Sequence, residues 1–320
     1  MRPLLRLVPD DTKIPFMKGR YAGVITSAIL STLSVILFFY PGLNYTIDFM
    51  GGVMAEVRFA APVDPSQVRS SFDSLHLGEA QVQQFGSASD ALVRLSTTAR
   101  AEEIRPQIQG VLDKNFQGAE IRSLDVVGAK VSGELLRDGL TATAMALIGI
   151  FSWIWFRFDW QYGVGLTATL VLDATKTIGF YGVTQLPFDL NALAALLILV
   201  GFSVTDKVVV YDRIRENLRK FKTMPLRQVI DVSINQTLSR TVATSLTVLL
   251  SILPLAIIGR GSVQFFAITM VFGIIVGTTS SIFIASPILL FLGEKRLRTV
   301  APPEPARELV QPGQARGGAA

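Results

Sequence analysis

The chain has 320 residues, of which half are apolar and only 17% are charged, and its formal net charge is +5. This composition excludes an ordinary soluble protein and indicates a membrane protein. The chain has no cysteine, which excludes disulfides, thiolate metal sites and cysteine nucleophiles. Its single histidine, His76, argues against histidine-rich zinc sites and against a Ser-His-Asp triad with a later histidine. We explain the positive charge by basic cytoplasmic loops, so we expect no nucleic-acid partner.

Motifs of hydrolytic enzymes are absent from the sequence. It contains no G-x-x-x-x-G-K-[ST] phosphate loop, no H-E-x-x-H and no G-x-S-x-G. We therefore expect no enzyme, no catalytic residues, no metal and no cofactor.

Residues 21–40 form an uncharged run of 20, which is long enough to cross the roughly 30 Å of a bilayer core as a helix. A basic segment, 1–20, precedes the run and is expected in the cytoplasm. A cleaved signal peptide is the alternative interpretation. However, the run is long for such a signal, and bulky Phe38, Phe39 and Tyr40 stand where small residues should precede a cleavage site. We therefore predict a retained first span.

Residues 41–137 are polar and mixed, and they predict a small α+β domain. Expected strands at 54–59, 80–85, 91–96 and 119–127 alternate with helices at 66–75 and 101–115. Asp64 and Pro65 suit the N-cap and first position of the first helix. The segment GSASD, 86–90, predicts a turn between the second and third strands. The resulting order β-α-β-β-α-β is typical of a ferredoxin-like domain.

Five more spans are predicted within 138–292, at about 139–156, 163–183, 191–210, 238–258 and 263–292. The fold class is therefore a multi-pass α-helical membrane protein with six transmembrane helices and one small α+β domain. Basic residues are concentrated in the ends of the chain, the turn near 157 and the segment 212–235. The loops 184–189 and 259–262 together contain only one arginine. The positive-inside rule then places both termini in the cytoplasm and the 41–137 domain outside. The tail, 293–320, is rich in Pro, Gly and Ala and is expected to be disordered.

Charged residues inside the predicted spans are the candidate functional residues. Each costs about 3 kcal/mol in a bilayer unless it is paired or hydrated. They are Asp173, Lys176, Asp206, Lys207 and Arg240. Asp206 is the leading candidate for ion coupling, with Arg240 as its candidate partner. The simpler alternatives are a static Asp173–Lys176 pair, with Lys207 and Arg240 reaching to the membrane edge.

The fifth span has a polar face, on which residues recur at helical spacing: Gln236, Arg240, Thr244 and Thr247, with Ser239, Thr241 and Ser245 nearby. A membrane carboxylate, a cation and a path lined by hydroxyls are the parts that proton translocation needs. Gln236 and Thr244 are therefore candidate modulators of the site, together with Lys176 and Lys207. In the sixth span, Gly273, Gly277 and Ser281 form a small-residue face that permits close helix packing.

Two long motifs resemble signatures of the SecD/SecF family. GLNYTIDFMGG, 42–52, is similar to the element after the first span, and VGFSVTDKVVVYDRIREN, 200–217, is similar to the SecF-type fourth span. VVGAKVSGEL, 126–135, INQTLSRTVATS, 234–245, and GTTSSIFIASP, 277–287, resemble further family segments. The motif residues singled out are Gly42, Asp48, Phe49, Gly51, Gly52, Asp212, Arg213, Arg215, Glu216 and Asn217.

The resemblance implies half of an RND-type transporter in the bacterial inner membrane, in contact with membrane lipids. It implies SecD and the SecYEG translocon as partners, unfolded preprotein as cargo, and a proton or sodium gradient as the driving force. It assigns ion coupling to Asp206, Arg240 and Asp173. Alternatives are a half-transporter for lipids or small molecules and a scaffold that moves no ions.

The sequence departs from the family pattern near the candidate site. Leu172 stands in place of a frequent histidine and Thr205 in place of the usual asparagine, and Lys176 and Lys207 replace small or apolar residues. Two extra cations would favour the ionised state of the nearby carboxylates, which bears directly on proton binding.

Overall fold

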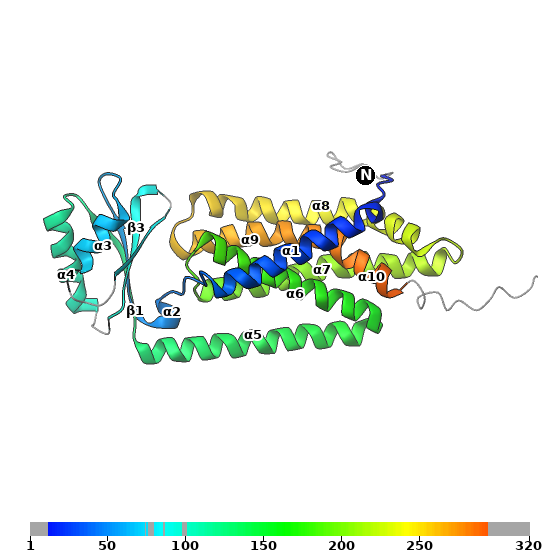
Figure 1. Cartoon of the computed structure of the whole chain (residues 1–320), viewed down its shortest axis with the longest axis horizontal. Helices are drawn as coiled ribbons and strands as arrows, with labels where there is room; N and C mark the ends of the chain where they lie inside the picture. The colour runs from blue at the N-terminus through cyan, green and yellow to red at the C-terminus, as the bar shows by residue number, and fades with distance from the viewer. Residues whose placement is uncertain (1–11, 74, 76–79, 86, 98–100, 294–320) are drawn as a thin grey trace, which may run out of the picture.

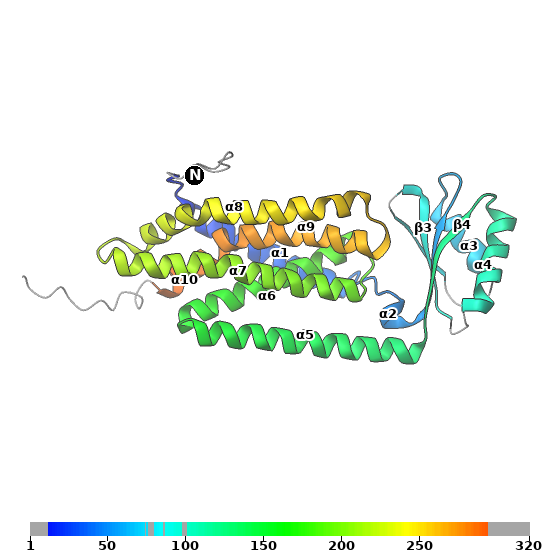
Figure 2. The same cartoon turned by 180° about the vertical axis from the view of Figure 1, so that it is seen from behind.

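The molecule is elongated, with a helical bundle joined end to end to a small α/β domain (Figure 1). This computed structural model describes residues 12–73, 75, 80–85, 87–97 and 101–293, so His76 and nearly all of the 293–320 tail lie outside the described residues. Five helical segments are long and apolar enough to cross a membrane: Phe16–Phe39, Ala129–Arg157, Leu190–Lys220, Leu226–Ile258 and Gly261–Leu292. A further long helix, α6 (Trp160–Thr184), carries Asp173 and Lys176 and runs within the same bundle (Figure 2).

The bundle is built from helices that extend beyond the predicted spans. Its elements are η1 (Phe16–Gly19), α1 (Arg20–Phe39), α5 (Ala129–Arg157), α6, α7 (Leu190–Lys220), α8 (Leu226–Ile258), α9 (Gly261–Ser280), the π-helical turn η2 (Ser281–Ala285) and α10 (Ser286–Gly293). The basic segment 212–235 is therefore mostly helix, with only 221–225 between α7 and α8. Asp212 of this segment pairs with Arg157 of α5, so α7 continues past the apolar stretch.

Helices α6, α7 and α9 form the centre of the bundle, whereas α1 and α5 cover it from outside. The buried residues of α1 are all serines: Ser27, Ser31 and Ser34. Small residues allow this close packing, because a Cβ atom on Gly179 of α6 would clash with Ser34, and one on Gly273 of α9 would clash with Leu199 of α7. The small-residue face predicted on the last span thus packs directly against α7.

The α/β domain contains β1 (Gly52–Arg58), α3 (Pro65–Asp73), β2 (Ala80–Phe85), β3 (Ser87–Leu95), α4 (Ala101–Asn115) and β4 (Glu120–Val127). The four strands form one antiparallel sheet in the order β2-β3-β1-β4, and both helices lie on one face (Figure 1). The helix signals in the sequence hold, since the Asp64 carboxylate accepts the Ser66 amide at 3.0 Å and Ile104, Ile108 and Leu112 are buried.

The turn predicted at 86–90 is wrong for most of its length, because β3 already begins at Ser87. Asp90 lies opposite Arg58 in the β1–β3 register, and its two carboxylate oxygens accept from the guanidinium at 2.7 and 2.9 Å. Its pKa is lowered by this hydrogen-bonded arginine. A cross-strand ion pair thus satisfies a polar segment that resembles a turn when it is taken in isolation.

The first family-like motif joins the two parts of the molecule. Its short helix α2 (Ile47–Met50) is followed by Gly51 and Gly52, which have φ of 73° and 120°. A Cβ atom on Gly52 would lie 2.5 Å from the Leu95 carbonyl oxygen, so only glycine fits there. The Asp48 carboxylate accepts the Leu190 amide at 3.2 Å, and Phe49 packs in a buried cluster with Phe188. The motif therefore anchors the α/β domain to the start of α7.

Candidate intramembrane site

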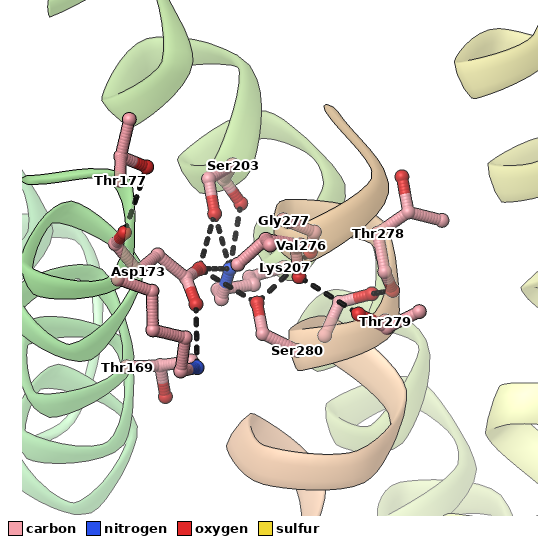
Figure 3. A network of polar contacts seen from close by, with 12 residues as sticks. Thr169, Asp173, Thr177, Ser203, Lys207, Val276, Gly277, Thr278, Thr279 and Ser280 are labelled. Atoms are coloured by element: carbon pink, nitrogen blue, oxygen red, sulfur yellow. Dashed lines mark hydrogen bonds and ion pairs between the residues drawn. The ribbon is translucent and has the colours of Figure 1, made fainter. Parts of the chain in front are cut away.

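A buried polar cluster surrounds the Asp173 carboxylate where α6, α7 and α9 meet (Figure 3). Its Oδ2 accepts hydrogen bonds from Ser203 at 2.8 Å, Ser280 at 2.6 Å and the Lys207 ammonium at 2.8 Å. Lys207 also contacts the Ser203 hydroxyl. Each of these side chains is less than a tenth exposed. A charge-assisted network of this kind provides the partners that a buried carboxylate requires.

Lys207 is fully buried and turned toward the interior of the bundle. The alternative in which it reaches to the membrane edge is therefore wrong. Its ammonium crosses from α7 to Asp173 on α6, so it neutralises that carboxylate and not Asp206, the residue before it. Successive residues on a helix point about 100° apart, so Asp206 faces α8 instead.

Lys176 provides a second and looser contact to the same carboxylate. Its Nζ lies 3.5 Å from Asp173 Oδ1, and its side chain is 7% exposed. The Asp173–Lys176 pair expected from the three-residue spacing is therefore present, but Lys207 holds the shorter contact. One carboxylate thus faces two ammonium groups.

Asp206 is only half satisfied. Its Oδ1 accepts from the Thr241 hydroxyl of α8 at 2.7 Å, whereas its buried Oδ2 has no hydrogen-bond partner among the residues that the structure describes. A carboxylate with one free oxygen in an apolar bundle is suited to binding a proton or a small cation.

Arg240 does not reach Asp206. It is exposed on α8, and within the described part of the chain its guanidinium forms no ion pair. The cause is helical geometry, because the next residue, Thr241, already occupies the face toward α7. Thr244 is also exposed, and its hydroxyl donates to the carbonyls of Arg240 and Thr241 in its own helix. The sequence leaves open whether Asp206 and Arg240 pair within one chain, and in the structure they do not.

The second family-like motif forms a clamp at the end of the bundle away from the α/β domain. Asp212 pairs with Arg157 at 3.2 Å and Arg215 with Asp159 at 3.7 Å, which ties α7 to the α5–α6 turn. Arg213 pairs with Glu216 at 2.6 Å.

Gln236 belongs to this clamp, because its Oε1 accepts from Arg213 at 2.8 Å and from Asn217 at 2.7 Å. The predicted modulator Gln236 thus lies with the motif and makes no contact with Asp206.

Sequence reasoning missed Ser203 and Ser280, which complete the Asp173 site, whereas Thr241 of the Asp206 site lies among the hydroxyls expected near the polar face of the fifth span. A signal for Ser203 was available, since it stands four residues before Lys207 and therefore on the same helix face. No comparable signal marks Ser280, because it meets Asp173 from another helix. In the described residues, no three His, Cys, Asp or Glu side chains lie close enough to hold a metal ion.

Comparison with known proteins identifies the family of the chain. A family model for the protein export membrane protein SecD/SecF, C-terminal, matches residues 107–295. The chain belongs to the SecD/SecF family. Relatives called protein translocase subunit SecF are 40% identical in Rickettsia rickettsii and 37% identical in Cereibacter sphaeroides. These alignments cover 91% of this chain and 96% and 93% of the relatives.

Solved structures of SecDF have the same fold. A crystal structure of SecDF from Thermus thermophilus, described as a translocon-associated membrane protein, matches with a TM-score of 0.82 and 33% identity. A second structure, SecDF in a super-membrane-facing form, matches with a TM-score of 0.67. Both matches cover 91% of this chain but only 40% of the SecDF chain. This SecD/SecF family member thus resembles less than half of the SecDF chain. The relatives that it matches over nearly their whole length are called protein translocase subunit SecF.

Proposed function

We propose that this SecF-like chain is an accessory subunit of protein export that couples ion movement to preprotein translocation. In this proposal it acts with SecD and the SecYEG translocon in the bacterial inner membrane, driven by the proton-motive force. The observation that carries the proposal is the half-satisfied Asp206 carboxylate, buried in the bundle of a chain that is similar to SecF over nearly its whole length.

The geometry of Asp206 supports a role in ion coupling. The Asp173 carboxylate is already neutralised by Lys207 and bonded by two hydroxyls. Asp206 has only the Thr241 hydroxyl, so it can take up a proton without breaking an ion pair. We therefore assign the coupling role to Asp206 and a structural role to the Asp173–Lys207 pair.

Arg240 supports an interface with SecD. It lies with Gln236, Asp212 and Glu216 around a surface hollow of 610 Å³ between α7 and α8. An exposed arginine on a membrane helix is costly unless another protein or water covers it. Because the matched SecDF chain is much longer than this one, the remainder of such an assembly would supply a second subunit. Arg240 then faces a carboxylate or acceptor of SecD.

The proposed topology has six membrane crossings, with α6 as the third. The charges of Asp173 and Lys176 lower the hydropathy of α6, but both are buried against other helices. The termini lie in the cytoplasm, and the β-α-β-β-α-β domain, which we interpret as ferredoxin-like, lies outside, where it contacts emerging preprotein.

Replacement of Asp206 by Asn tests this function. The variant keeps the size and the Thr241 contact but cannot ionise, so we expect export driven by the proton-motive force to lose its stimulation by the subunit. Translocation into inverted membrane vesicles measures the effect, and Asp138→Asn, on the exposed surface of α5, is the matched control. Normal stimulation by Asp206→Asn in an intact complex would contradict the proposal and favour a scaffold.

A further inference from the structure

A pocket of 330 Å³ lies between α1, α6 and the α9–η2 junction, next to the Asp173 cluster. Its wall includes Ser27 of α1, Lys176 of α6 and Thr279 of α9, together with apolar residues such as Leu30 and Phe283. Since a water molecule occupies about 30 Å³ in the liquid, the pocket has room for several.

Two buried serine hydroxyls of α1, one of which belongs to the pocket wall, lack protein partners among the described residues. Ser27 is 4% exposed, and its hydroxyl forms no hydrogen bond with any residue that the structure describes. The hydroxyl of Ser31, one turn further along the same buried face, is also without a partner there. A buried hydroxyl without a partner costs about 1–3 kcal/mol, and a water molecule that enters beside Ser27 would recover this cost. An acyl chain could not supply these hydrogen bonds.

The charges of the cluster distinguish its two lysines. With every group ionised, Asp173, Lys176 and Lys207 carry one excess positive charge. Lys207 is fully buried with the short contact to Oδ2, whereas Lys176 has only the 3.5 Å contact to Oδ1 and borders the pocket. Loss of one proton from Lys176 makes the cluster neutral and leaves the Asp173–Lys207 pair in place.

We propose that this pocket is filled with water and that Lys176 exchanges protons with it. The Lys176 ammonium releases one proton to a pocket water and becomes a neutral amine, and it takes up one proton in the reverse step. The titratable groups that face it are Asp173 on its own helix and Lys207 on α7. The walls from α1 and α9 present only hydroxyls and apolar groups, such as Ser27 and Thr279. This inference rests on the proposed ion-coupling function.

Cysteine labelling tests whether the pocket is hydrated. Because the chain has no cysteine, Ser27→Cys and Ile29→Cys place single thiols two residues apart on α1. Ile29 is 62% exposed on the outer surface of the helix. A charged methanethiosulfonate reagent reacts with the thiolate, which forms only where water reaches it. In membranes that contain the assembled complex, we expect labelling at position 27 and none at 29. Absence of labelling at 27 would overturn the hydrated pocket.

Proton uptake tests the role of Lys176. Arginine keeps the positive charge but does not lose its proton, and methionine removes the charge. We therefore expect both Lys176→Arg and Lys176→Met to lose proton uptake by liposomes that contain the complex, with assembly unchanged. If Lys176→Arg retains uptake while Asp206→Asn loses it, Lys176 is only a fixed charge and this inference alone fails. If the parent complex takes up no protons, the proposed function fails as well.

Discussion

Lys207 is the residue whose role the structure changes most. In sequence it follows Asp206 and suggests a local perturbation of that carboxylate. In the structure it crosses to α6 and pairs with Asp173 at 2.8 Å, while Asp206 turns to Thr241. Lys207 thus has a defined partner on α6, and among the described residues no cation pairs with Asp206.

The Asp173–Lys207 pair leads to a prediction about stability. Lys207→Met leaves a buried carboxylate with only hydroxyls and the distant Lys176, so we expect a loss of about 3–5 kcal/mol in the free energy of unfolding. The double variant Asp173→Asn/Lys207→Met removes both charges and should recover most of that loss. Unfolding of the purified protein in detergent measures both. A Lys207→Met variant as stable as the parent would show that the pair is not needed.

At this scale the sequence predicts which charged residues are buried in the bundle better than it predicts their partners. Charges in apolar spans identify Asp173, Asp206 and both lysines, because their cost in lipid is general. Which charge meets which depends on the rotation of each helix about its axis. That rotation is set by packing contacts such as Gly273 against Leu199, which a single sequence does not show.

Among the elements, α1 is held to the bundle by small residues and not by apolar side chains. Gly179 of α6 lies against Ser34, whereas a Cβ atom added to Gly149 of α5 would meet nothing within 4 Å. We expect Gly179→Ala to cost about 1–3 kcal/mol through overpacking, because the Ser34 backbone blocks the added methyl group. Gly149→Ala should be neutral or stabilising by up to about 1 kcal/mol.

Thermal unfolding in detergent compares these two variants directly. The pair is matched, since both place alanine in the interior of a long helix. Equal stability of Gly179→Ala and Gly149→Ala would mean that α1 is free to move away from α6.

The start of α7 provides a prediction on pH. Asp189 is its N-cap, with Oδ1 accepting the Ala192 amide at 2.8 Å, and burial raises the pKa of its carboxyl. A raised pKa means that the folded state favours the protonated form, so the free energy of unfolding falls as pH rises from about 3.9, the unfolded value, through the folded pKa. Asp189→Asn keeps a good cap without this penalty.

We therefore expect the stability of Asp189→Asn relative to the parent to increase between acidic and neutral pH. Chemical unfolding at several pH values measures the difference. Asp189→Ala, which removes the cap, should lose about 1 kcal/mol and serves as the control. A difference between Asp189→Asn and the parent that does not change with pH would contradict the raised pKa.

For the whole molecule, hydropathy and loop charge predict a multi-pass bundle with one inserted α/β domain, and the described structure has this arrangement (Figure 1). Helix ends are predicted less well. Helices α5, α7 and α8 continue beyond the apolar runs because residues such as Asp212 and Asn217 find partners on adjacent helices.

The α/β domain is fixed to α7 through Asp48 and Phe49, so a movement of α7 would be transmitted to it.

The central claim is that Asp206 couples ion movement to export. Proton uptake by liposomes that contain the purified complex with SecD tests it most directly. We predict uptake by the parent and by Asp138→Asn, and loss of uptake by Asp206→Asn with the complex intact. Uptake by Asp206→Asn at the rate of the parent would contradict the claim.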